Sequence, residues 1–210
     1  YYYQHHKLTP EHIDKAIDKG KYLDILYYYQ HHKLTPEQID KAIDKGIALN
    51  VLYEYKKNMP SENIDHAIDK GEYLEYLYVF QKNMSPKNID HAIDKGIALN
   101  ILYLNQKYLS PENIDHAIDK GIDLNSLYKK HHQHLTPEQI DKAIDKGIAL
   151  DVLYENQKNL TSKQIDKAID KGKELSKLYL NYELTPKQLA KALDKGIALD
   201  VLYENQKNLT

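Results

Sequence analysis

The sequence predicts an all-α protein: an α-solenoid (superhelix) of about eight helical hairpins, each about 25 residues long. Two observations carry this prediction. Eight glycines recur at intervals of 24 to 26 residues, and each one closes the triplet Asp-Lys-Gly. Each triplet follows a version of the segment Leu-Thr-Pro-Glu-Gln-Ile-Asp-Lys-Ala-Ile, which is complete at residues 34–43 and 135–144. Self-similarity at a short fixed period is typical of stacked repeats, in which each unit covers the hydrophobic face of the next.

We expect one repeat array over residues 1–210. Its predicted repeats are 8–33, 34–58, 59–83, 84–108, 109–134, 135–159, 160–183 and 184–208. Residues 1–7 are identical to residues 27–33, the tail of a repeat, and residues 209–210 open a further one. Neither end carries the altered, polar face that terminal repeats usually have. We therefore expect the chain to be a segment of a longer array.

The first helix of each repeat has clear start and stop signals, as residues 34–58 illustrate. Thr35 is a strong N-cap residue, and Pro36 suits the first helical position. Gln38 can bond back to the cap backbone and complete a capping box. Gly46 ends the helix in the left-handed conformation, and Ile47 is expected to fold back onto the last turn.

One repeat departs from this start signal. Pro60 and Ser61 reverse the usual Ser-Pro order. We expect the loss of a proper cap there, at a cost of about 1 kcal/mol.

Both helices carry an apolar stripe at helical spacing. In the first helix the stripe is Ile39, Ala42 and Ile43, and in the second it is Leu49, Leu52 and Tyr53. The second-helix tyrosine recurs in all eight repeats, at Tyr27, Tyr53, Tyr78, Tyr103, Tyr128, Tyr154, Tyr179 and Tyr203. We expect these tyrosines in the core, with each phenol tip reaching water or a neighbouring carboxylate.

Charged residues of the first helix are predicted to form a solvated face. Asp40, Lys41, Asp44 and Lys45 alternate in sign, and Glu37 precedes Lys41 by four residues, which favours a pair within the helix. Such pairs contribute tenths of a kcal/mol and keep the array soluble.

Variation between repeats concentrates on the second helix and the turn that leads into it. Aromatic residues at these variable positions gather in the first three repeats. We expect them to form a partner-binding surface, because exposed aromatics on a rigid frame are the usual anchors of protein interfaces. The alternative is that they fill gaps between helices. The candidate residues are Tyr22, Tyr28, Tyr29, Tyr55, Tyr73, Tyr76 and Phe80.

Composition excludes several classes of protein. The 31 acidic residues balance 29 basic ones, all lysine, for a net charge of −2. Cysteine is absent, which excludes disulfides and thiolate metal sites and fits a reducing compartment. No apolar run approaches the ~20 residues that cross a bilayer, and no signal peptide is visible. We expect a cytoplasmic location (host cytoplasm or virion if the chain is phage-encoded) and no membrane partner.

The sequence argues against an enzyme. No cysteine nucleophile exists, every glycine is assigned to a helix end rather than to a phosphate-binding loop, and the serines and threonines are mainly caps. We expect no catalytic residues and no cofactor.

Ten of the eleven histidines fall into two groups. His66, His91 and His116 occupy one position in consecutive repeats, where other repeats have lysine, and rungs about 10 Å apart are too distant to share a zinc ion. The others gather at helix ends and could pick up a transition metal adventitiously or tune stability with pH. They are His5, His6, His31, His32, His131, His132 and His134. No dedicated metal site is predicted.

The whole chain resembles short-repeat α-solenoids of the HEAT-like and leucine-rich-repeat-variant kind. Its tandem Leu-Thr-Pro-Glu-Gln units are similar to repeat proteins common in bacteriophage and bacterial genomes. Residues 34–38 also resemble the start of a TAL-effector repeat, whose inter-helix loop reads one DNA base. Here that loop is Asp-Lys-Gly in every repeat and carries no code, and the net charge of −2 without arginine does not suit phosphate binding.

We therefore expect a non-enzymatic scaffold for protein–protein interaction, with a partner that the sequence does not name. Two alternatives remain open. One is a structural spacer or assembly element of a larger particle, acting through self-association. The other is a TAL-like nucleic-acid-binding solenoid, against which the charge and the constant loop argue.

Overall fold

The computed structural model describes residues 8–206, and the predicted end segments 1–7 and 209–210 lie outside them. Within the described range all regular structure is helical, with sixteen α-helices, two short 3-10 helices and no strand. Each Asp-Lys-Gly triplet joins a longer first helix to a shorter second helix. The all-α, α-solenoid prediction is confirmed. The chain divides into two compact units, Tyr1–Ser110 and Pro111–Thr210.

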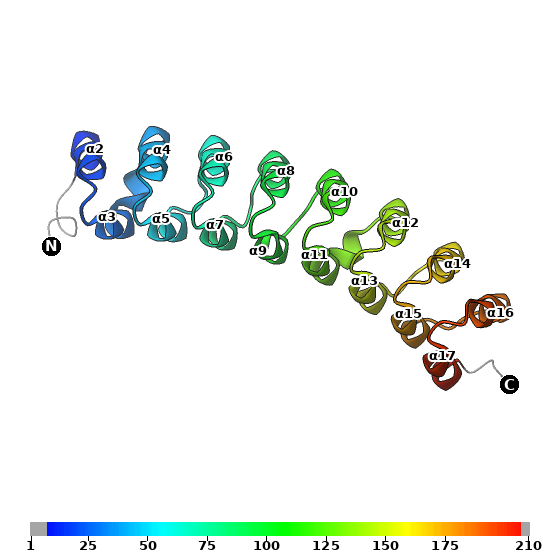
Figure 1. Ribbon diagram of the computed structural model, residues 1–210. Coiled ribbons are helices and arrows are strands. Elements are labelled where there is room, and N and C mark those ends of the chain that lie inside the picture. The colour runs from blue at the N-terminus through cyan, green and yellow to red at the C-terminus, as the bar shows by residue number, and fades with distance from the viewer. Residues whose placement is uncertain (1–7, 207–210) are drawn as a thin grey trace. The chain divides into compact units, whose positions relative to one another are not determined.

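The first unit contains four hairpins (Figure 1). Its helices are α2 (Pro10–Lys19), α3 (Leu23–Gln30), α4 (Pro36–Lys45), α5 (Leu49–Tyr55), α6 (Ser61–Lys70), α7 (Leu74–Phe80), α8 (Pro86–Lys95) and α9 (Leu99–Asn105), with the 3-10 helix η1 (His31–Lys33) after α3. The first helices α2, α4, α6 and α8 pack in one row, and the second helices α3, α5, α7 and α9 pack in another. Every helix therefore packs against the equivalent helix of the neighbouring hairpin.

The second unit repeats this arrangement. Its helices are α10 (Pro111–Lys120), α11 (Leu124–His131), α12 (Pro137–Lys146), α13 (Leu150–Asn156), α14 (Ser162–Lys171), α15 (Leu175–Asn181), α16 (Pro186–Lys195) and α17 (Leu199–Asn205), with η2 (His132–His134) after α11. Here α10, α12, α14 and α16 form the row of first helices, and α11, α13, α15 and α17 form the row of second helices.

Local signals in residues 34–58 act as the sequence predicts. Thr35 Oγ1 accepts a hydrogen bond from the backbone N–H of Gln38 at 3.3 Å, and Gln38 Oε1 accepts one from the N–H of Thr35 at 3.2 Å. The capping box is confirmed. Helix α4 ends at Gly46, whose φ is 71° and whose N–H donates to the Ala42 carbonyl at 3.2 Å. The left-handed conformation costs an L-residue about 1–2 kcal/mol, which favours glycine there.

The reversed order Pro60–Ser61 does remove the cap of α6, which has no side-chain hydrogen bond at its N-terminus. The Ser61 hydroxyl instead donates to Asn88 Oδ1 of the next hairpin at 2.9 Å. A bond between repeats therefore takes the place of a bond within one.

The turn into the second helix contains another left-handed residue, which the sequence reading missed. Ala48 has φ 56° and ψ 34° immediately before α5. The equivalent residue is left-handed in every repeat, at Tyr22, Ala48, Tyr73, Ala98, Asp123, Ala149, Glu174 and Ala198. Each hairpin thus holds a non-glycine residue in a conformation that L-residues disfavour, and Asn58, with φ 57°, is a second one in residues 34–58.

Ile47 lies between these two left-handed residues and is 42 % exposed. Its Cδ1 reaches the preceding hairpin, where it lies 3.2 Å from the position that a Cβ on Gly20 would occupy. Ile148 makes the same approach to Gly121 in the second unit. In both units, the isoleucine that follows a glycine therefore covers the glycine turn of the preceding hairpin.

The core of each unit is formed by the predicted apolar stripes. Ile39, Ala42, Leu49 and Leu52 are fully buried, as are their equivalents in most repeats. Seven of the eight second-helix tyrosines are at most 1 % exposed. Tyr203 on α17 differs and is 58 % exposed, because no helix of residues 8–206 packs beyond α17.

The prediction that each phenol tip reaches water or a carboxylate is wrong for most of these tyrosines. Their hydroxyls are buried with no hydrogen-bond partner, in the part of the chain that the structure describes, at Tyr27, Tyr53, Tyr78, Tyr128, Tyr154 and Tyr179. The whole side chain, hydroxyl included, is buried in these six residues. Burial raises the pKa of Tyr78 far above its ordinary value, because the charged phenolate would be desolvated.

Polar contacts between hairpins follow three lines that the sequence reading did not anticipate. The first joins the start of neighbouring first helices: Gln38 Nε2 donates to the Pro10 carbonyl at 3.0 Å, and Gln139 Nε2 donates to the Pro111 carbonyl at 2.8 Å. The amide that completes a capping box thus also donates to a backbone carbonyl of the previous hairpin. Asn63 and Gln164 repeat this contact.

The second line joins the middle of neighbouring first helices, where a cation meets carboxylates of the previous repeat. Lys41 Nζ lies 2.9 Å from Asp18, and Lys142 Nζ lies 2.7 Å from Asp119. The charged face was predicted to be solvated, with a pair inside the helix between Glu37 and Lys41. These lysines instead pair with the neighbouring hairpin.

Histidine replaces lysine in this line at α6 and α8. His66 Nδ1 lies 2.8 Å from Asp40 Oδ1, and its Nε2 lies 2.9 Å from Asp44 Oδ1. His91 spans Asp65 and Asp69 of the preceding helix at 3.1 and 3.0 Å. Both ring nitrogens can donate only when the imidazole is protonated. The expectation that these histidines substitute for lysine agrees with this geometry.

The third line joins the segments that follow the second helices. Gln81 Nε2 donates to the Lys56 carbonyl at 2.9 Å, while its Oε1 accepts from the Met59 N–H at 3.0 Å. Gln206 makes the equivalent pair of contacts with Tyr182 and Leu184 at 3.0 and 2.9 Å. One buried glutamine therefore satisfies two backbone groups of the preceding linker.

Replacing Tyr78 with Phe should leave the stability of the array unchanged or raise it by up to about 1 kcal/mol, because the buried hydroxyl has no partner to lose. Tyr78→Ala, which opens a cavity, should cost about 3–5 kcal/mol. Urea unfolding followed by circular dichroism measures both. A loss above 1 kcal/mol in Tyr78→Phe would show that the hydroxyl is hydrogen-bonded and contradict this prediction.

Replacing His66 with Lys should make the array less sensitive to pH. The hydrogen bond with Asp40, followed by the charges of Asp44 and Asp40, holds the pKa of His66 above its ordinary value against an opposing effect of burial. Its contribution is therefore complete below pH about 6.5 and is lost as the pH rises through the folded pKa. Lysine stays charged, so the variant should gain about 0.2–1 kcal/mol over the parent between pH 6 and 8.5.

The measurement is the urea midpoint of both proteins across that pH range. His32→Lys is the matched control, because it removes an exposed imidazole that has no ion pair in residues 8–206. Parallel pH profiles for the parent and His66→Lys would contradict the prediction.

Candidate partner-binding surface

Three of the predicted tyrosines form one cluster on neighbouring second helices. The ring of Tyr28 on α3 lies 4.6 Å from that of Tyr29 and 4.8 Å from that of Tyr55 on α5, both in edge-on geometry. The packing of α3 against α5 brings Tyr28 and Tyr55 together across two repeats. His31 borders the group, with its ring 5.9 Å from that of Tyr55. We call Tyr28, Tyr29 and Tyr55 the tyrosine cluster.

A second aromatic group lies on α7 and the turn before it. The rings of Tyr73 and Tyr76 are 6.3 Å apart, and those of Tyr76 and Phe80 are 6.4 Å apart and stacked. Tyr76 and Phe80 are four residues apart and lie on one side of α7, and Tyr73, just before the helix, contacts Tyr76. Tyr22, in the turn before α3, makes no ring contact with another aromatic residue of the described chain. The seven predicted residues therefore lie in two groups and one single position.

These aromatic residues differ in exposure. Tyr22 is 70 % exposed, Tyr28 46 %, Tyr73 45 % and Tyr76 38 %. Tyr29, Tyr55 and Phe80 are half-buried. The surface thus combines rings that pack on each other with rings that reach solvent, as in the anchor residues of interfaces.

Carboxylates lie beside the tyrosine cluster. A hollow of about 390 Å³ between α3 and α5 is lined by Asp24 and Glu54 together with the three tyrosines. Burial, followed by the charges of Glu54 and Tyr28, raises the pKa of Tyr55 above its ordinary value. The Tyr55 phenol therefore carries no charge near pH 7, and Asp24 and Glu54 are the acidic residues of this hollow.

The equivalent face of the second unit carries different side chains. Lys129, Glu155 and Leu180 occupy the position of Tyr28, and Asn156 occupies that of Tyr55. Leu180 is 53 % exposed on α15. The backbone frame is the same, so this face differs in chemistry rather than in shape.

The helix-end histidines within residues 8–206 lie in two places. His31 and His32 contact each other edge-on at 5.6 Å, and His131 lies 6.4 Å from His134. Within residues 8–206, no group of three or more histidine and carboxylate side chains is placed to hold a metal ion. The predicted pair His5–His6 lies outside the described residues.

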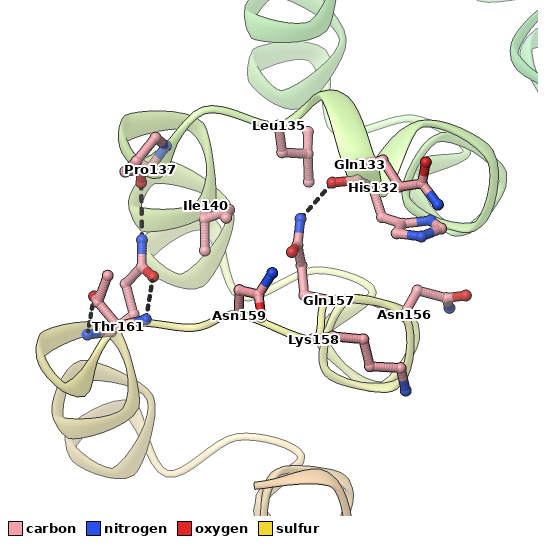
Figure 2. Close-up of a pocket in the computed structure, with 11 residues that line it drawn as sticks. His132, Gln133, Leu135, Pro137, Ile140, Asn156, Gln157, Lys158, Asn159 and Thr161 are labelled. Carbon is pink, nitrogen blue, oxygen red and sulfur yellow. Dashed lines mark hydrogen bonds between the residues drawn. The ribbon is translucent and has the colours of Figure 1, made fainter.

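A larger hollow, of about 480 Å³, lies in the second unit, between the segments that lead into α12 and α14 (Figure 2). Leu135 and Ile140 form its apolar side, and Asn156, Gln157 and Asn159 contribute amides. Gln157 is only 8 % exposed, and its Nε2 donates to the His132 carbonyl.

Gln157 differs from its counterparts in the third line of contacts. The Leu135 N–H, which would be its partner, donates instead to the His132 carbonyl at 3.4 Å within η2. No hydrogen bond to Gln157 Oε1 is present in the described chain, and this oxygen faces the hollow. The sequence reading missed this feature; its only signal is the extra residue in the repeat 109–134.

None of the helices in residues 8–206 combines the length and the apolar character that a membrane span requires. Fold and surface together define a tandem helical-repeat protein. Comparison with protein-family models, with curated proteins and with solved structures finds no match to the chain.

Proposed function

We propose that this chain is a non-enzymatic repeat scaffold that binds a protein partner through the second-helix surface of its first three hairpins. The observation that carries the proposal is the aromatic surface that the exposed Tyr28, Tyr73 and Tyr76 form with the half-buried Tyr55, on a frame whose equivalent helices pack in the same way from repeat to repeat. The resemblance to HEAT-like solenoids supports it, since stacked helical repeats create extended binding surfaces.

The chemistry of the surface favours a protein partner. Tyrosine presents a large apolar ring with a polar tip and loses few rotamers on binding, so it is enriched at the centres of interfaces. Phosphate binding would need a run of basic side chains, whereas Asp24, Glu54 and Glu75 lie on these helices. The surface therefore suits a polypeptide better than a nucleic acid.

Serine at Tyr28, Tyr55 and Tyr76 together should weaken partner binding at least tenfold, because truncating an interface anchor typically costs about 2 kcal/mol. Peptides selected from a displayed random library on the parent chain serve as the partner, and biolayer interferometry gives the Kd. Helicity by circular dichroism should stay at the parental value, because none of the three side chains is in the buried stripes.

The matched control is the double variant Lys129→Ser and Leu180→Ser, which truncates exposed second-helix residues of the other unit. It should bind the selected peptides with the parental Kd. If the tyrosine variant binds as tightly as the parent, or if the library yields no binder, this assignment of function is wrong.

A further inference from the structure

We propose that the hollow between α3 and α5 is a receptor for an arginine side chain of the partner protein. This inference rests on the proposed function and narrows it, because it states which residue the tyrosine cluster recognises. The hollow measures about 390 Å³ and is lined by Asp24, Tyr28, Tyr29, Glu54 and Tyr55, with the apolar Ile25 and Val51 between them.

The negative charge of the hollow is uncompensated. Asp24 and Glu54 form no ion pair in the described chain, whereas carboxylates of the first helices pair with lysine or histidine of the next hairpin. Asp24 is exposed and Glu54 is half-exposed. The solenoid thus neutralises carboxylates where hairpins meet, and leaves these two facing the tyrosine cluster.

The aromatic rings add a second attraction for a cation. A guanidinium or ammonium within about 6 Å of a tyrosine ring is attracted by its π face. Guanidinium is planar and can lie on a ring while it bonds a carboxylate in bidentate fashion, which the compact, strongly hydrated ammonium cannot do. The aliphatic stem of the bound side chain would lie along Ile25 and Val51.

The arginine must come from outside these 210 residues. They contain no arginine, so neither their own side chains nor a second copy of them can supply a guanidinium. His31, beside Tyr55, marks the end of the cluster away from Asp24.

The probe is acetyl-Gly-Arg-Gly-amide, titrated into the full chain and followed by NMR shifts of the tyrosine rings. We expect saturable shifts of Tyr28 and Tyr55, and at least tenfold weaker binding of the neutral isostere with citrulline in place of arginine. The lysine peptide should bind several-fold more weakly than the arginine peptide. Equal binding of the arginine and citrulline peptides would overturn the inference.

The decisive variant is Asp24→Asn with Glu54→Gln, which keeps the shape of the hollow and removes its charge. It should weaken the arginine peptide at least tenfold. The matched control is Asp151→Asn with Glu155→Gln on α13, which removes the same two charges beside Asn156 instead of a tyrosine. The control should bind as the parent does. Unchanged affinity in the first variant, or an equal loss in both, contradicts an arginine site.

The two proposals fail in different ways. One outcome is that peptides selected from the library lose binding to the tyrosine variant but not to the variant Asp24→Asn with Glu54→Gln. That result would support the partner-binding surface and contradict the arginine site. If the arginine peptide binds as described but the library yields no binder, the result supports the arginine site and contradicts the scaffold function.

Discussion

The structure depends on the burial of one hairpin's apolar stripe against the next hairpin. Helices of seven to ten residues are marginal alone in water, and every second helix outside α3 and α11 has only seven. Their stability comes from Leu, Ile and Tyr side chains that no single hairpin can cover. Tyr27 is fully buried in the first hairpin, while Tyr203 on α17 is mostly exposed. The tyrosine is therefore covered by the hairpin that follows it, and this explains why an unpartnered hydroxyl is tolerated: the ring is needed to fill the junction.

Polar contacts between hairpins set the register of this packing. An apolar stripe is non-directional, so it allows neighbouring hairpins to slide. Each of the three lines of contact reaches a fixed atom of the preceding repeat. The contacts are made by the amide of Gln38, by the cation of Lys41 or His66, and by the amide of Gln81. Three such contacts along one junction fix both the spacing and the rotation of the hairpins. Positions outside the stripes and these contacts remain free to vary, and the aromatic surface occupies such positions.

Much of the fold could be predicted from the sequence because its signals are local and repeated. The capping box at Thr35 and the left-handed Gly46 follow from residue type and spacing, and the structure reproduces both. The contacts between repeats could not be predicted this way. Lys41 has a possible partner within its own helix and another in the previous repeat, and only the packing geometry decides between them. The same limit applies to the candidate surface: residue types indicated aromatic anchors, but the pairing of Tyr28 with Tyr55 required the helices to be placed.

Departures from the repeat show how the junctions adapt to an inserted residue. The repeats 8–33 and 109–134 each have one residue more than the usual 25, and each ends in a 3-10 helix. In both, the 3-10 turn satisfies the N–H of the following leucine, at Leu34 and Leu135. In the next repeat, the residue at the position of Gln81 and Gln206 then needs a hydrogen-bond donor but no acceptor. Lys56 meets this need, because its ammonium donates to the Leu34 carbonyl at 3.1 Å and it has no acceptor to leave unsatisfied. Gln157 also meets this need, because its Nε2 donates to the His132 carbonyl. Its Oε1 has no hydrogen bond in the described chain and faces the larger hollow. The two side chains donate to different carbonyls, of Leu34 and of His132, and only the glutamine leaves an acceptor without a hydrogen bond in the described chain.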